Sequence, residues 1–362
     1  MTQTDDRSSP DEYVIGETYP LAPPARTEEH GHVRIGETPA ERWGRPGTRL
    51  ADDEPDDDQY DEPVPDAELY DARLAEAVTH FQERHGIEPD GRVGAETLTE
   101  LNVPAEERRM AILLNLDRWR WLPRDLGERY VLVNVAAFEL AVMEDDEPVL
   151  RMNVVVGKEG RNTPFFQDTL EYVVVNPYWN VPQSILERDI MPVARRDPGY
   201  LARNGYEVLP GGRVRQRPGS NNSLGAVKFL FPNDMNVYLH DTPAKHLFRR
   251  TTRAFSSGCI RVEKPDELAE YLLRTSTSRS PGTYRTLRDS GREQWVQLEE
   301  KVPIYILYFT AWVDGDGSVR FYRDVYERDG AISEVARIAL APRPQARVIE
   351  PAPFAAGDLT GQ

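Results

Sequence analysis

The fold is organised by two short segments, Tyr238-Leu239-His240-Asp241-Thr242-Pro243 and Phe255-Ser256-Ser257-Gly258-Cys259-Ile260-Arg261-Val262. The second segment holds the only cysteine of the 362 residues, and His240 precedes that cysteine by 19 positions. The spacing suits a strand that ends at His240, a crossing arm, and a tight Ser-Ser-Gly turn that presents Cys259. The two segments therefore predict a cysteine nucleophile with a histidine base within hydrogen-bond reach.

The base is chosen among six histidines. The four that precede the strand-rich part of the chain are His30, His32, His80 and His85. His246 lies in the polar arm TPAKHLFRR, where a solvated side chain is expected, whereas His240 ends an apolar strand that gives a rigid platform. We expect His240 to take the proton of Cys259, which would form a thiolate–imidazolium pair with a thiol pKa below about 8.5.

The residues around Cys259 indicate how a substrate would be held. Gly258 allows a tight turn and a close backbone approach. The backbone N–H groups of Gly258 and Cys259 are expected to form an oxyanion hole beside Ser257. In an extended chain Arg261 lies on the same side as Cys259, where it can hold a substrate carboxylate. A lone buried cysteine is otherwise typical of inert packing, so that alternative stays open here.

From Tyr130 onward the hydrophobic pattern is that of strands, with apolar and β-branched runs bounded by Asn, Asp and Gly. These runs predict a mostly antiparallel sheet. They are Tyr130–Ala136, Phe138–Met143, Val149–Val156, Leu170–Val175, Val227–Phe231, Asn236–His240, Ile304–Val313 and Val319–Tyr322. Lys264-Pro265 is expected to open a helix that runs through Leu273.

A long polar excursion, residues 185–225, interrupts the strands. Ser184 is expected to cap a helix to about Ala194, and Asp197-Pro198 to start another. Long excursions of this kind are usually functional or disordered, and the helical signals favour a lid over the active site. A plain surface insertion is the alternative.

The N-terminal half is divided into three parts. Residues 1–65 are rich in Pro, Asp and Glu and are expected to be largely disordered. Residues 66–103 contain a helix over Tyr70–His85, with Leu74, Val78 and Phe81 on one face, and a short helix over Gly94–Leu101. Residues 104–129, opened by Pro104, are expected to form a connecting helix.

Composition excludes several classes of protein. The net charge of −17 is mostly a property of residues 1–70, which carry 19 acids and six arginines, and no basic patch for nucleic acid is visible. One cysteine excludes a disulfide framework and a multi-cysteine metal site. No apolar run is long enough to span a membrane, and Met1 to Pro20 lack the pattern of a signal peptide. Neither a metal nor a cofactor is expected.

Two stretches resemble known bacterial cell-wall families. Residues 77–102, AVTHFQERHGIEPDGRVGAETLTELN, resemble the small helical peptidoglycan-binding domain through Phe81–Gly86 and Asp90–Gly94. The stretch VYLHDTPAKHLFRRTTRAFSSGCIRV is similar to the signature of the L,D-transpeptidases with a YkuD-like catalytic domain. In that signature a His is followed after about 15 residues by Ser/Thr-His-Gly-Cys and an Arg or Asn. The likeness extends over VNPYWNVPQSI, RDPGYLARNGYEV and YFTAWVDGDGSVRF, and covers roughly residues 70–328.

The resemblance implies an enzyme that forms 3→3 cross-links in peptidoglycan. Cys259 would attack the third residue of a tetrapeptide stem and release D-Ala, and an amine of a second stem would take the thioester. His240 would be the base, the Asp241 backbone would orient it, and Tyr238 and Ser256 would shape the pocket. Carbapenem acylation of Cys259 follows by the same analogy. Water in place of the amine would give an L,D-carboxypeptidase or endopeptidase.

The chain departs from the family where Ser257 replaces the usual histidine before Gly-Cys, which predicts altered pH dependence or substrate choice. A weakly active peptidoglycan-binding protein is therefore a further alternative. The resemblance implies peptidoglycan stem peptides as partners and a periplasmic or cell-envelope location, and leaves the oligomeric state unknown.

The expected fold class is α+β. A small helical domain, residues 66–103, would precede a mostly antiparallel, β-sandwich-like catalytic domain, residues 130–328, which carries the helical lid. Residues 329–362 would form a C-terminal tail.

Overall fold

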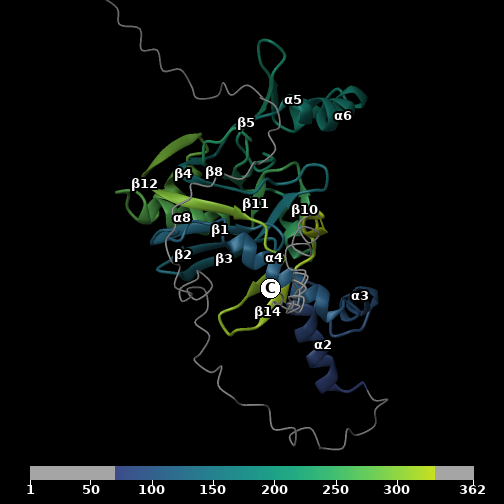
Figure 1. Cartoon of the computed structure of the whole chain (residues 1–362). Coiled ribbons are helices and arrows are strands. Elements are labelled where there is room, and N and C mark those ends of the chain that lie inside the picture. Colours follow the sequence, from purple (N-terminus) through teal and green to yellow (C-terminus); the bar gives the residue numbers. More distant parts are fainter. Residues whose placement is uncertain (1–69, 331–362) are drawn as a thin grey trace, which may run out of the picture.

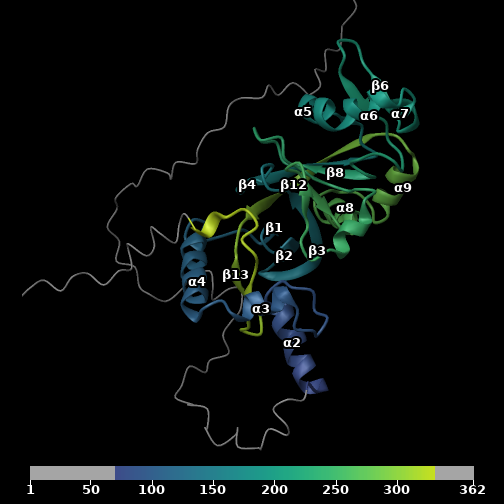
Figure 2. The same ribbon diagram turned by 90° about the vertical axis from the view of Figure 1, so that its right-hand side faces the viewer.

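The computed structural model describes residues 70–330. Figures 1 and 2 show a helical N-terminal part, a large sheet, and a smaller unit with short helices on the side of the sheet away from the N-terminal helices. The predicted α+β class, with a small helical part and a large, mostly antiparallel sheet, is confirmed. The predicted acidic segment 1–65 lies outside the described residues, as does the predicted tail from residue 331 onward.

From residue 70 onward, three helices precede the sheet. They are α2 (Ala72–Arg84), α3 (Ala95–Leu101) and α4 (Ala105–Trp119). The carboxylate of Asp71 caps α2 by accepting the N–H of Leu74 at 2.8 Å, and Gly86 follows the helix with a φ of +61°. Helices α2 and α3 therefore begin and end close to the predicted residues, whereas α4 ends at Trp119, ten residues before the end of the predicted connector 104–129.

Gln82 joins the two helices of the hairpin from inside. Its side chain is 1% exposed and donates to Asp90, to the Arg92 carbonyl and to Thr97 at 2.9–3.1 Å. Its carbonyl oxygen accepts the N–H of Gly91 at 2.9 Å. One amide thus satisfies the turn between α2 and α3, which gives a physical reason for glutamine in the Phe-Gln-x-x-His-Gly element.

Nine strands form one sheet in the order β10-β3-β11-β9-β8-β4-β12-β1-β2, and a β2–β3 pairing closes it. The strands are β1 (Arg129–Asn134), β2 (Glu139–Glu144), β3 (Glu147–Gly157), β4 (Phe166–Val175), β8 (Val227–Leu230), β9 (Leu239–His240), β10 (Ala254–Ser256), β11 (Ile260–Val262) and β12 (Gln294–Leu307). The pairs β1–β12, β10–β3 and β11–β9 are parallel, and the others are antiparallel. The predicted sandwich-like layers thus belong to one closed sheet.

The main core lies on one face of this sheet. Val131, Val133 and Ile304 point into it, together with Leu268 and Leu272 of α8 (Pro265–Thr275). Helix α9 (Thr283–Asp289) follows α8 and packs beside it.

The opposite face of β1, β2 and β12 carries a second core. Tyr130, Leu132 and Tyr305 pack there against Trp119 of α4 and Trp312. Trp312 belongs to the hairpin β13 (Ala311–Val313) and β14 (Val319–Phe321). Alternation along the strands separates the two cores.

Two predicted strands differ most from the structure. The strand predicted for Ile304–Val313 is divided, because β12 ends at Leu307 and Ala311–Val313 form β13. β12 begins at Gln294, ten residues before the predicted start, because the polar run through Lys301 lies on an exposed, bulged part of the strand. The predicted strand Asn236–His240 is reduced to Leu239–His240, since Asn236 has a φ of +53° that no strand accommodates.

Gln82→Ala is expected to unfold the helical hairpin locally. It leaves the buried N–H of Gly91 without its partner and costs about 2 kcal/mol or more. Hydrogen exchange of residues 72–101 should accelerate by at least an order of magnitude, on the order expected from that free energy. The matched control is Glu83→Ala, which truncates an exposed neighbour on the same helix. Equal exchange in the two variants would contradict the account.

Candidate active site

The pairing of β9 with β11 brings the predicted catalytic residues together. The two strands are parallel, with Ile260 opposite Leu239 and Arg261 opposite His240. Ile260 and Leu239 point into the main core and are fully buried. Since side chains alternate along a strand, the flanking residues lie on the opposite face. Those residues are Tyr238, His240, Cys259 and Arg261.

The imidazole of His240 is held in one tautomer by the chain that follows it. Its Nδ1 lies 2.5 Å from the carbonyl oxygen of Asp241. A carbonyl can only accept, so Nδ1 carries the proton and Nε2 is the basic nitrogen. The Asp241 backbone therefore occupies the orienting place that the sequence predicts for it.

The carboxylate of Asp241 fixes this corner. It is 8% exposed and accepts from the N–H of Ala226 at 2.8 Å, the N–H of Thr242 at 2.6 Å and Nζ of Lys245 at 2.6 Å. A Cβ at Gly225 would lie 2.1 Å from this carboxylate, so only glycine fits there. The hydrogen bonds of the Asp241 carboxylate thus fix the backbone next to His240, and with it the position of the imidazole.

Burial keeps His240 neutral. Desolvation is the main cause that lowers the pKa of His240 to about 3, and the positive charge of Arg261 lowers it further. His240 is 5% exposed, whereas His246 in the 3₁₀-helix η3 (Lys245–Arg249) is exposed. His240 is therefore a neutral imidazole, protonated on Nδ1 alone, at neutral pH.

The thiol of Cys259 is stabilised in its protonated form. Burial raises the pKa of the Cys259 thiol, against the opposing effects of hydrogen bonds from the backbone and hydroxyl of Tyr238 and of the charge on Arg261. The thiol donates to the carbonyl of Asn236 at 3.7 Å. The expected thiolate–imidazolium pair, with a thiol pKa below its usual range, is therefore wrong for the free enzyme. Desolvation penalises both charges.

The turn before Cys259 is closed by Ser256. Gly258 has a φ of +122°, which favours glycine. The N–H of Gly258 donates to Oγ of Ser256 at 3.1 Å, and that hydroxyl donates to the carbonyl of Cys259 at 2.5 Å. The Gly258 amide is thus engaged and does not match the predicted oxyanion role. No acceptor for the Cys259 amide lies within residues 70–330.

A cation stands beside Ser257, the position that departs from the family pattern. Nη1 of Arg161 donates to Oγ of Ser257 at 3.1 Å and lies 3.6 Å from the carboxylate of Asp189. That carboxylate is bound more closely by Arg188, at 2.8–3.0 Å. Arg161 therefore brings a fixed positive charge to a place where the neutral Ser257 supplies none.

Arg261 lies on the same face of β9 and β11 as His240 and Cys259. Burial lowers the pKa of its guanidinium, which the Cys259 side chain partly offsets. Its buried Nε has no hydrogen-bond partner in the part of the chain that the structure describes. A half-buried guanidinium with a spare donor is suited to an anionic group of a ligand.

The predicted lid is a small unit with its own core. It contains a three-stranded sheet, β5 (Trp179–Asn180), β6 (Tyr206–Val208) and β7 (Val214–Gln216). Its helical segments are α5 (Gln183–Ile185), the π-helix η2 (Leu186–Ile190), α6 (Met191–Arg196) and α7 (Tyr200–Arg203). The first helix follows Pro182 rather than a Ser184 cap, and α7 begins after Gly199 rather than at Asp197-Pro198.

This unit reaches the site at two points. Trp179 hydrogen-bonds the hydroxyl of Tyr238, which packs against both the main core and the core of the lid. Asp189, in the π-helix, faces Arg161. Figure 1 shows the unit beyond β4 and β8. It is therefore in contact with the site, although its role as a lid remains a prediction.

Three residues of the site were missed by the sequence analysis: Trp179, Arg161 and Asn236. Trp179 lies in the stretch VNPYWNVPQSI, which signalled a family likeness but no particular contact. Arg161 lies in a polar loop between two strands, where nothing in the local pattern marks a function. Asn236 acts through its backbone carbonyl, which any residue provides.

Between residues 70 and 330 no group of three or more His, Cys, Asp or Glu side chains is arranged to hold a metal ion. Over the same residues no helix is long and apolar enough to cross a membrane.

Comparison with known proteins identifies two domains. Residues 128–304 match the family model described as YkuD, L,D-transpeptidase catalytic domain, and residues 58–101 match the "Putative peptidoglycan binding domain". A curated relative from Haemophilus influenzae, described as "Putative L,D-transpeptidase", is 32% identical over 246 residues. The match covers 61% of this chain and 48% of the relative, so the chain spans about half of that relative's length.

Solved structures give weaker likenesses. An L,D-transpeptidase from Mycobacterium smegmatis has 16% identity and a TM-score of 0.26, with 50% of this chain and 58% of that chain covered. L,D-transpeptidase 3 from Mycobacterium tuberculosis, in complex with a faropenem-derived adduct, has 12% identity and a TM-score of 0.25, with 49% and 60% covered. The sequence matches carry the assignment: residues 128–304 match the L,D-transpeptidase catalytic domain of the YkuD family, and they follow a stretch that matches a peptidoglycan-binding domain.

Proposed function

We propose that this protein is a peptidoglycan L,D-transpeptidase that forms 3→3 cross-links through a thioester on Cys259. The observation that carries the proposal is the shared face of β9 and β11. It groups Cys259, the neutral base His240 and the cation Arg261. The family match and the Haemophilus relative support the same reaction class. The proposed setting is the cell envelope, where the substrate lies.

The first half-reaction begins with a neutral thiol and a neutral imidazole. As sulfur attacks the carbonyl of the third stem residue, Nε2 of His240 takes the thiol proton. The N–H of Cys259 would donate a hydrogen bond to the developing oxyanion. Collapse breaks the peptide bond, and His240 returns the proton to the leaving amine of D-Ala. A thioester on Cys259 remains.

Residues around Cys259 act on the charges that develop on the sulfur and the imidazole in the transition state. Arg261 stands beside both the thiol and the imidazole, so it favours developing negative charge on sulfur and disfavours a long-lived imidazolium. The hydroxyl and amide of Tyr238 stabilise the same sulfur. We propose that Arg261 also holds a stem carboxylate, and that Arg161 supplies the positive charge that Ser257 lacks.

In the second half-reaction an amine of an acceptor stem attacks the thioester. His240 removes a proton from that amine, and Cys259 leaves as a thiol. The lid unit, proposed for residues 185–225, would exclude water from this step. The helical domain, residues 66–103, would bind the wall. Residues 104–129 would connect it to the catalytic domain, residues 130–328.

Product analysis tests the reaction. With a purified disaccharide-tetrapeptide, the enzyme is expected to produce a cross-linked dimer and one D-Ala for each bond, because an amine takes the thioester. Mass spectrometry of the products would reveal both species. Tripeptide without dimer would identify a carboxypeptidase instead. If neither D-Ala nor dimer were formed, the result would favour a wall-binding protein.

The pH dependence of Cys259 tests the neutral pair. Burial raises the thiol pKa, so the alkylation rate with iodoacetamide should rise with pH through an apparent pKa above about 8.5, the value of a free thiol. His240→Ala should leave this alkylation pKa above 8.5, because no ion pair is lost. The same variant should slow acylation by a carbapenem by about 100-fold or more, because that reaction needs the base.

The matched control is His246→Ala, which removes the exposed histidine of the same arm and should change neither rate. An apparent alkylation pKa below 8.5 that disappears in His240→Ala would instead establish a thiolate–imidazolium pair. A loss of acylation in His246→Ala would move the base to that residue.

A further inference from the structure

The peptide bond between Gly258 and Cys259 is fixed by a hydrogen bond from the buried Thr163. Oγ1 of Thr163 donates to the carbonyl of Gly258 at 2.7 Å, and it accepts the N–H of Gly157 at 2.9 Å. The side chain of Thr163 is fully buried. A Cβ at Gly157 would lie 2.0 Å from the carbonyl oxygen of Arg161, so this loop can turn back under the nucleophile only with glycine there.

This contact has a consequence for the oxyanion donor. The carbonyl of Gly258 and the N–H of Cys259 belong to one planar peptide unit and point in opposite directions when that unit is trans. No cis peptide bond occurs within residues 70–330. By drawing the Gly258 carbonyl inward, Thr163 therefore turns the Cys259 N–H outward, toward the face that carries the thiol.

Thr163 is itself held by Tyr326. The hydroxyl of Tyr326 donates to the carbonyl of Gly157 at 2.5 Å and accepts the N–H of Thr163 at 3.2 Å. Tyr326 is 7% exposed and lies beyond residue 304, where the match to the catalytic-domain family ends. A residue outside the matched domain thus closes the hydrogen-bonded loop beneath the nucleophile.

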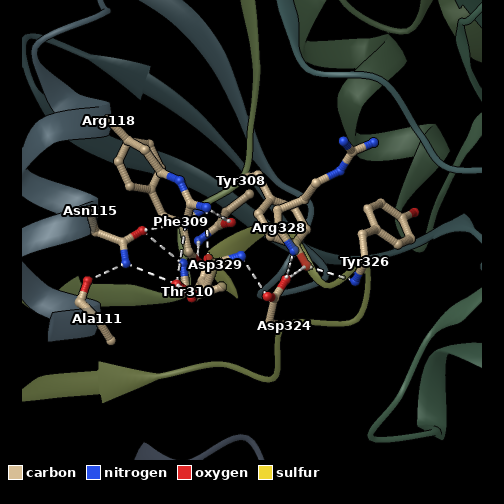
Figure 3. Close-up of polar contacts among 11 residues, drawn as sticks. Ala111, Asn115, Arg118, Tyr308, Phe309, Thr310, Asp324, Tyr326, Arg328 and Asp329 are labelled. Atoms are coloured by element: carbon tan, nitrogen blue, oxygen red, sulfur yellow. Dashed lines mark hydrogen bonds and ion pairs between the residues drawn. The ribbon is translucent and has the colours of Figure 1, made fainter. Parts of the chain in front are cut away.

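Figure 3 shows the contacts that fix Tyr326 in turn. Its N–H donates to the hydroxyl of Tyr308 at 2.9 Å, and that hydroxyl donates to Asp324 at 2.6 Å. Asp324 accepts the N–H of Asp329 at 2.7 Å, and Asp329 pairs at 2.7 Å with Arg118 of α4. The network runs from the connecting helix to the loop under Cys259.

We propose that Thr163 and Tyr326 are positioning residues that aim the Cys259 amide at the oxyanion, and that the segment 308–329 is a working part of the catalytic unit. The inference rests on the proposed function, because it needs a carbonyl that is attacked by Cys259. It adds to that function two residues that touch no reacting atom. Thr163 lies 95 positions before its partner Gly258, and Tyr326 lies 163 positions after its partner Thr163.

The test compares two reactions of the same thiol in the full-length protein. Acylation by a carbapenem develops an oxyanion, whereas alkylation by iodoacetamide does not. Thr163→Val keeps the shape and removes the hydroxyl, so the maximal acylation rate should fall about tenfold or more, as when an oxyanion donor is displaced. The alkylation rate should stay within about twofold, and Thr163→Ser, which keeps the hydroxyl, should restore acylation.

Tyr326→Phe should lower acylation in the same selective way, by about threefold or more, since it acts through Thr163. The matched control is Tyr284→Phe, which deletes the hydroxyl of another buried tyrosine, bonded to Asp266 at 2.6 Å and outside the hydrogen-bond network of Tyr326. Its acylation rate should be unchanged, although its stability also falls.

Two results would overturn the inference. One is acylation in Thr163→Val that matches the wild type, or that falls only in step with alkylation. The other is a Tyr326→Phe rate equal to that of Tyr284→Phe. Absence of any carbapenem adduct on the wild-type enzyme is a separate result, which would overturn the proposed function and the inference with it.

Discussion

The site depends on the parallel pairing of two very short strands, β9 and β11. Leu239 and Ile260 anchor that pairing in the core, and their neighbours consequently emerge on the opposite face. A shift of one residue in β11 would send Cys259 into the core, and a shift of one residue in β9 would turn Leu239 toward the substrate. Such short strands specify little by themselves. Contacts with neighbouring segments fix their register. The carboxylate of Asp241, which follows β9, accepts the N–H of Ala226, and Thr163 bonds the turn that precedes β11.

Burial gives the site an electrostatic character that differs from that of an ion-paired cysteine. The thiol is kept protonated and the imidazole neutral, because both charged forms lose solvation. Charge then develops only when a substrate carbonyl is attacked, next to Arg261 and the Tyr238 donors. A thiol of this kind would react slowly with small electrophiles in solution and still attack a carbonyl that is placed beside a base and an amide donor. Selectivity for a positioned substrate follows.

Much of the fold was predictable from sequence, because the strand pattern and the helical hairpin follow from periodicity. A single cysteine and the elimination of other histidines only suggested the pair His240 and Cys259, which the family resemblance favoured and which stays a proposal. The protonation states were not predictable, because they depend on burial that a sequence pattern does not report. The prediction that the Gly258 amide is an oxyanion donor was wrong, because that amide donates to Ser256, two residues away. Thr163 and Tyr326 were missed because their contacts join distant parts of the chain.

The central claim is that Cys259 carries the stem peptide as a thioester, and trapping that intermediate tests it most directly. The enzyme would be mixed with a tetrapeptide donor in the absence of an acceptor stem, quenched in acid within its first turnover, and analysed by intact mass and peptide mapping. The account predicts an adduct with the mass of the donor minus one D-Ala, on the peptide that contains Cys259, and no adduct in Cys259→Ala. Release of D-Ala without a covalent species on Cys259, or with the adduct on another residue, would contradict it.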